Sequence, residues 1–160
     1  MTILQENPPV KTRDMLIGAL LRVPAQAIQR RIIKELNAAG FERLSMPHMA
    51  VLRFPSPDGA RPGVLAERAG MSKQAMNQLL QSLEELGYVR RTSDAGDGRA
   101  RVVRLTKRGR AAWDTIHDVL RQVETEWRAT LGDKHFKQLK MLLLEVWESS
   151  LISTTHDQTV

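Results

Sequence analysis

Apolar residues recur every three or four positions along most of this 160-residue chain, which predicts a mainly α-helical protein. The first such stretch begins near Arg13 and ends at Gly40. Pro24 lies inside it, so we expect either a kink or two abutting helices there. Ser45 can cap a second helix, with Pro47 tolerated in its first turn, and the loop at 55–59 ends it.

Two long apolar patterns close the chain. The first runs from a cap at Thr106 to Leu131, and Gly132 ends it. The second follows Asp133, which we expect to cap it, and continues to Trp147. The apolar residues of these helices and of the first one exceed what a small chain needs for its own core. Either a second subunit covers them, giving a homodimer, or they form a packed monomer core.

The middle stretch, 61–106, predicts shorter elements in a different order. A short apolar helix is followed by a turn at Gly70 and by a second helix that Ser72 caps and Gly87 ends. Two short β-branched, Arg-rich stretches, 88–92 and 100–105, flank a Gly/Asp loop and predict a hairpin. The order is that of a helix-turn-helix with a β-wing, and it makes double-stranded DNA the leading candidate partner.

Charge supports this interpretation. The formal net charge is +6, and residues 61–110 hold 11 Lys and Arg against 5 Asp and Glu, while the rest of the chain holds 13 of each. A basic cluster is typical of phosphate binding, although charge alone also fits a generic solvated face. The chain has no cysteine, no apolar run of membrane-spanning length and no secretory signal pattern, so we expect a cytoplasmic protein without a membrane partner.

The start of the second helix carries side chains suited to DNA. Lys73 stands in its first turn, where acidic residues are normally preferred, and a phosphate near Ser72 would reverse the penalty. Gln74, Asn77 and Gln78 can both donate and accept hydrogen bonds, as reading base edges requires. The alternative is a polar helix face that serves only solubility.

The hairpin tip offers further candidates. Arg99 and Arg101 on a thin wing can reach a minor groove, where negative potential is concentrated. Asp97 would instead stabilise the tip by accepting hydrogen bonds from an arginine or from loop amides. The alternative is an exposed hairpin whose charges only keep its edge from pairing.

These motifs together resemble the MarR family of winged-helix regulators. The resemblance rests on VLAERAGMSKQAMNQLLQSLEELGYVRR at 64–91, on Asp97-Gly98-Arg99 and on VRLTKRGR at 103–110. It implies a homodimer with interlocked terminal helices, a recognition helix starting at Ser72 and a wing arginine at position 99. It also implies control by a small aromatic or phenolic effector, bound between the dimerisation helices and the DNA-binding lobe. Pro24 departs from the pattern, and the absence of cysteine removes the thiol switch of some relatives.

Four residues are candidates for an effector pocket. His48 with Met49 on the second helix, and Trp113 with His117 on the long helix, either line such a pocket or serve ordinary helix packing. The histidines are scattered without metal-ligand spacing, so we expect no metal site and no cofactor. No catalytic cluster is present in the sequence, so an enzyme is not expected.

The sequence therefore predicts a winged helix-turn-helix flanked by N- and C-terminal dimerisation helices. Residues 1–44 and 107–160 would form the dimer, and residues 45–106 would bind DNA. The predicted function is a sequence-specific transcriptional regulator, a ligand-responsive repressor that binds a palindromic operator as a homodimer. Two alternatives are a low-specificity structural DNA binder and a winged helix used for ligand sensing or protein interaction.

Overall fold

The structure of the chain is a computed structural model that describes residues 14–53, 57–93 and 101–149. It is mainly helical, with a small antiparallel sheet, as the sequence predicts. The elements are α1 (Ile17–Ala38), the 3₁₀ turn η2 (Met46–His48), α2 (Met49–Leu52), α3 (Pro62–Ala69), α4 (Lys73–Glu85), β1 (Val89–Ser93), β2 (Arg101–Leu105), α5 (Lys107–Leu131) and α6 (Asp133–Glu148). No helix within these ranges is long and apolar enough to cross a membrane.

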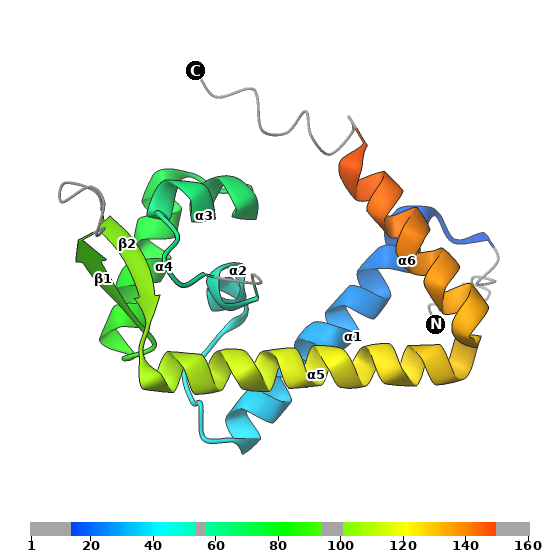
Figure 1. Cartoon of the computed structure of the whole chain (residues 1–160), viewed down its shortest axis with the longest axis horizontal. Helices are drawn as coiled ribbons and strands as arrows, with labels where there is room; N and C mark the ends of the chain where they lie inside the picture. Colours follow the sequence, from blue (N-terminus) through cyan, green and yellow to red (C-terminus); the bar gives the residue numbers. More distant parts are fainter. Residues whose placement is uncertain (1–13, 54–56, 94–100, 150–160) are drawn as a thin grey trace, which may run out of the picture.

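The helices are arranged as a compact lobe joined to an open frame (Figure 1). The lobe contains α2, α3, α4 and the β1–β2 hairpin, and α5 runs from beneath it to the far side of the molecule. α1 crosses α5, and α6 turns back from the far end of α5 at a distance from the lobe. The frame thus consists of the terminal helices, and the helix-turn-helix and wing lie at one end of it.

Local signals explain where the lobe's elements begin and end. The Ser72 hydroxyl accepts a hydrogen bond from the Ala75 N–H at 3.1 Å, and the Thr106 hydroxyl accepts one from Gly109 at 3.0 Å, so both predicted caps are confirmed. Gly70 makes the turn between α3 and α4 with a left-handed backbone (φ 62°). The hairpin pairs Val89 with Leu105 and Ser93 with Arg101.

Three sequence predictions need correction. α1 runs through Pro24 as one helix, so two abutting helices are not formed. The second helix is a 3₁₀ turn, which begins after Ser45 at the N-cap position, followed by one α-helical turn rather than one continuous α-helix. Asp133 does not cap α6, since Gly132 occupies the capping position and Asp133 is the first helical residue.

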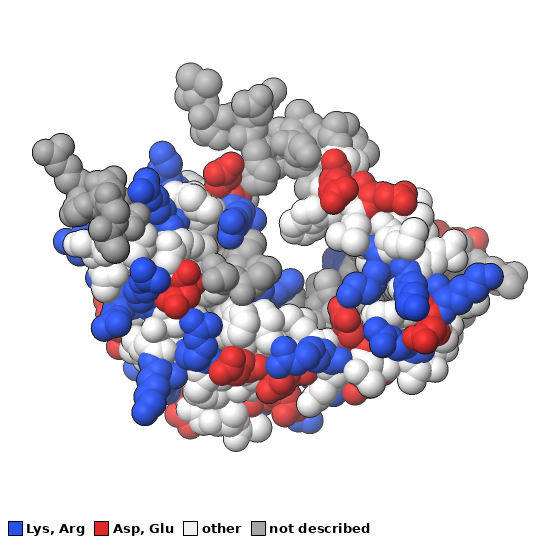
Figure 2. All heavy atoms as spheres, in the orientation of Figure 1, with Lys and Arg blue, Asp and Glu red and all other residues white. Residues whose placement is uncertain are grey.

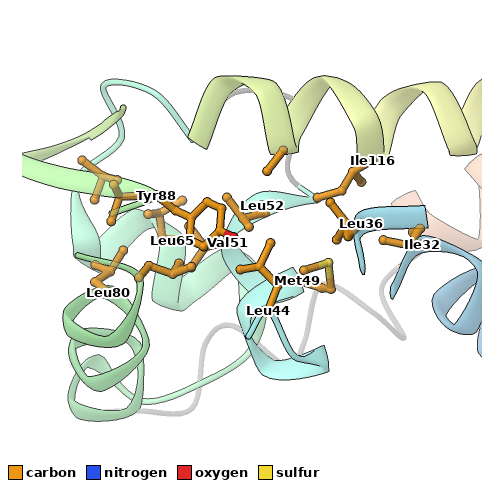
Figure 3. Packing of buried hydrophobic residues seen from close by; sticks show 14 of the residues in the cluster. Ile32, Leu36, Leu44, Met49, Val51, Leu52, Leu65, Leu80, Tyr88 and Ile116 are labelled. Atoms are coloured by element: carbon orange, nitrogen blue, oxygen red, sulfur yellow. The ribbon is translucent and has the colours of Figure 1, made fainter. Parts of the chain in front are cut away.

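The core fills the lobe and continues to the crossing of α1 and α5 (Figure 3). Tyr88, between α4 and β1, is fully buried, and its hydroxyl donates to the Glu42 carbonyl oxygen at 3.3 Å. Ile32 and Leu36 of α1 meet Ile116 of α5 in the same cluster. Burial of these apolar side chains fixes the lobe on one end of the frame, so α4 and the wing have a defined position relative to α1 and α5.

Candidate nucleic-acid interface

Helix α4 presents a polar face outward because its apolar residues repeat at helical spacing. Met76, Leu80 and Leu83 are buried against the lobe core. The opposite side is exposed over the first three turns, and it carries the predicted contact residues Ser72, Lys73, Gln74, Asn77 and Gln78. The structure therefore brings these side chains together on one accessible surface, which we call the α4 face.

The electrostatics of the α4 face favour an anion. The first turn of α4 contains no acidic residue, so its exposed N–H groups and Lys73 are not neutralised locally. Figure 2 shows Lys and Arg gathered over the winged lobe, with fewer acidic residues among them. A helix N-terminus with this charge attracts phosphate groups.

The wing contributes Arg101, which is exposed at the first position of β2 opposite Ser93. Asp97 and Arg99, the other predicted wing residues, lie outside the described residues. The base of the wing is tied to α4 by a pair that the sequence analysis did not identify. The Arg91 backbone N–H and its Nε each donate to Glu84 at 2.8 Å.

The Glu84 carboxylate is ionised in this arrangement. Burial alone raises the pKa of Glu84, but the side-chain and backbone hydrogen bonds from Arg91 outweigh it, with a smaller contribution from the charge of Arg101, and the net pKa is lowered. The ion pair thus links α4 directly to the wing strand β1.

A cavity of about 530 Å³ lies between the lobe and the terminal helices. Most of its wall is apolar, and Arg53 and Gln29 add polar groups; the lining residues are Gln29, Met46, Met49, Ala50, Arg53, Ala69 and Trp147. Among the described residues, Arg53 has no carboxylate partner. A second cavity of about 400 Å³ is almost wholly apolar and lies between α1, α5 and α6.

The predicted effector residues are separated by the fold. Met49 lines the larger cavity, and His48 is buried beside it. Trp113 and His117 stack on each other with ring centroids 3.7 Å apart, and neither lines either cavity. Gln29, Arg53 and Trp147 also line the larger cavity, and none of them was predicted from the sequence. Arg53 could have been found from the sequence, because it is the only charged residue in the apolar stretch 49–54. Gln29 and Trp147 could not, because they come from distant helices.

His48 is held by hydrogen bonds on both ring nitrogens. Its Nδ1 accepts from the Ser45 backbone N–H at 3.1 Å, and its Nε2 lies 3.0 Å from the Ser82 hydroxyl. Burial lowers the pKa of His48, which favours the neutral ring. Within the described ranges, no cluster of three or more His, Cys, Asp or Glu side chains is placed to hold a metal ion.

Comparison with known proteins identifies the family. Residues 44–100 match the MarR family. The HTH-type transcriptional repressor Rv2887 of Mycobacterium tuberculosis is 30% identical over 131 residues, which cover 81% of this chain and 92% of the relative. The chain belongs to the MarR family. It is accordingly a DNA-binding transcriptional regulator of the winged-helix type, as the resemblance predicts.

Solved structures share the fold. The crystal structure of Rv2887 from Mycobacterium tuberculosis in complex with salicylic acid superposes with a TM-score of 0.58 at 29% identity, covering 83% of this chain and 97% of that one. CouR from Rhodococcus jostii RHA1, bound to p-coumaroyl-CoA, gives a TM-score of 0.66 at 23% identity and covers 84% and 93%. At that lower identity, the likeness to CouR supports the fold alone.

Proposed function

We propose that this MarR protein is a ligand-responsive repressor, which acts in the cytoplasm as a homodimer on a palindromic DNA operator. The observation that carries the proposal is the α4 face, an exposed group of amide side chains beside Lys73 and an uncompensated helix N-terminus. Such a surface can enter a major groove and read bases there. Residues 45–106 would form the DNA-binding unit, and residues 1–44 and 107–160 the dimerisation unit.

Each contact residue has a distinct role in this proposal. Ser72 and Lys73, at the helix start, would meet a phosphate, since both the N–H groups and the ammonium attract it. Gln74, Asn77 and Gln78 would hydrogen bond with base edges in the major groove. In the wing, Arg99 and Arg101 would contact the backbone or the minor groove, and Asp97 would stabilise the tip.

The exposed apolar surface of the terminal helices supports a homodimer. Leu16 and Ile17 before and at the start of α1 are 82% and 71% exposed, and Trp147 of α6 is 68% exposed. Further exposed apolar residues on these helices are Leu20, Leu21, Val23, Met141, Leu142, Leu143, Leu144 and Val146. Monomeric proteins rarely expose contiguous apolar patches of this kind. A second copy would cover them and place two α4 faces on successive half-sites.

The larger cavity supports control by a small aromatic or phenolic acid. Its apolar wall, with Trp147 and two methionines, suits a ring, and Arg53 can pair with a carboxylate. It lies between the lobe and α6, so an occupant would contact both units. Salicylic acid is the molecule bound in the Rv2887 structure, and it is therefore the first ligand to test.

Footprinting on the DNA beside the protein's own gene tests the proposal. A protected inverted repeat is the expected result, and salicylate, related aromatic acids and phenols should reduce the protection. Arg53→Leu should keep the footprint and lose the response to salicylate, because it removes only the carboxylate partner. Protection no sharper than on random DNA would contradict the sequence-specific role.

A further inference from the structure

His48 lies at the junction between the larger cavity and the recognition helix. Its side chain is 7% exposed, and its ring is the hydrogen-bonded contact between the 45–48 turn and α4. Ser82, the α4 residue that it meets, lies one helical turn after Gln78 of the α4 face. A group that joins these two elements can carry a displacement of one to the other.

The hydrogen-bond partners determine the tautomer of the ring. A backbone N–H can only donate, so the Nδ1 that receives the Ser45 N–H carries no proton. The Ser45 hydroxyl also lies 3.1 Å from Nδ1 and can donate to the same lone pair. The neutral ring therefore has its proton on Nε2, and Nε2 donates to the Ser82 hydroxyl oxygen. The contact with α4 is thus directional, and it holds only while the ring keeps this orientation.

The sequence neighbours of His48 line the larger cavity. Met46, Met49 and Ala50 all line the cavity, and His48 stands between them in the tight η2–α2 segment. Met49 is itself buried in the core, so this part of the cavity wall is packed against the rest of the lobe. An occupant that pushes on this wall therefore moves the backbone of His48, and with it the ring that binds Ser82.

We propose that His48 is a positioning residue that couples occupancy of the cavity to the orientation of the recognition helix through its hydrogen bond to Ser82. This inference rests on the proposed function, since it needs DNA at the α4 face. In this proposal, the hydrogen bond between His48 and Ser82 transmits a change at the cavity to the DNA-binding α4 face. Coupling of this kind is reciprocal, so DNA on α4 must also change the cavity wall.

A double-mutant cycle tests the link without any small ligand. Ala50→Trp places a bulky side chain in the cavity as a fixed occupant, and Ser82→Ala removes only the hydroxyl that His48 meets. On an operator selected from random DNA, Ala50→Trp should weaken binding by on the order of tenfold. In the Ser82→Ala background, Ala50→Trp should weaken DNA binding by only about threefold or less. Thr115→Val, which removes a hydroxyl bonded within α5, is the matched control and should leave the full effect.

Hydrogen exchange covers the case in which Ala50→Trp does not fold. In the wild type, operator binding should slow amide exchange in residues 45–52, and Ser82→Ala or His48→Leu should abolish that slowing. His48→Gln should restore part of it, because the glutamine amide can donate to Ser82. The coupling would be overturned if Ala50→Trp and Ser82→Ala weakened DNA binding by independent factors, or if the slowing of amide exchange in residues 45–52 persisted in Ser82→Ala. Either result would leave DNA binding itself intact. A wild type that binds no DNA would remove the proposed function and this inference together.

Discussion

Gly109 in the first turn of α5 is the position where the structure makes the sharpest stability prediction. Its backbone packs directly on Tyr88, so that a Cβ added at Gly109 would lie 1.8 Å from the Tyr88 carbonyl oxygen. That oxygen also accepts the Thr106 N–H at 3.0 Å, which joins the wing base to the start of α5. Gly109→Ala must therefore displace backbone rather than a flexible side chain.

The expected cost follows from these contacts. Forcing an extra methyl into packed backbone costs about 1–3 kcal/mol, and weakening the Thr106 hydrogen bond adds about 1 kcal/mol. The helix gains about 0.5–1 kcal/mol when alanine replaces glycine, which offsets part of this. A net loss of about 1–3.5 kcal/mol in the free energy of unfolding remains, which corresponds to a Tm lower by about 2–14 °C for a chain of this length.

Thermal unfolding at fixed protein concentration measures the effect, because a dimer's Tm depends on concentration. Gly63→Ala in α3 is the matched control, since a Cβ there meets no atom within 4 Å. It should be neutral or stabilising by up to about 1 kcal/mol. Equal stability of the two variants would refute the packing argument at Gly109.

Three further predictions concern the DNA interface and pH. Asn77→Ala should cost about 1–3 kcal/mol on the operator and little on random DNA, and equal losses on both in binding titrations would exclude base reading. Arg101→Ala should flatten the slope of log affinity against log salt concentration by about one unit. Arg121 is exposed on α5, and the control Arg121→Ala should leave this slope unchanged. An unaltered slope in both variants would remove Arg101 from the interface. Burial lowers the pKa of His48, so the fold favours the neutral ring, and its contribution to stability is complete above about pH 6.5. That contribution is lost as the pH falls from 6.5 through the folded-state pKa. Urea unfolding at several pH values should therefore show that the free energy of unfolding decreases with falling pH, and that His48→Gln reduces this decrease. An identical pH dependence in the variant would contradict the role of His48.

The winged lobe could be predicted because its signals are local. Ser72 and Thr106 cap helices with their own side chains, and Gly70 permits a turn that other residues resist, so neighbouring positions suffice to place each boundary. The outward position of Asn77 and Gln78 follows likewise from the inward spacing of the leucines around them. The order of elements then determined the fold.

The lining of the larger cavity could not be predicted because its walls come from distant parts of the chain. Periodicity shows which side of a helix is apolar, but it does not show which helix that side meets. Trp113 and His117 were predicted together with His48 and Met49 as candidates for an effector pocket, and in the structure they stack on each other. Gln29 and Trp147 reach the cavity only through the crossing of α1 and the return of α6. The predicted capping residue of α6 was wrong by one position, since Gly132 (φ 79°) is the N-cap and Asp133 is the first helical residue.

Selection from a random-sequence DNA library tests the central claim, that two copies of the α4 face read a palindromic operator. The wild-type protein should enrich an inverted repeat with half-site centres one helical turn, or a small multiple of it, apart. Asn77→Ala should relax the preference at one base pair in each half-site. Retention of DNA without any enriched sequence, or enrichment of a single unrepeated site, would contradict the account.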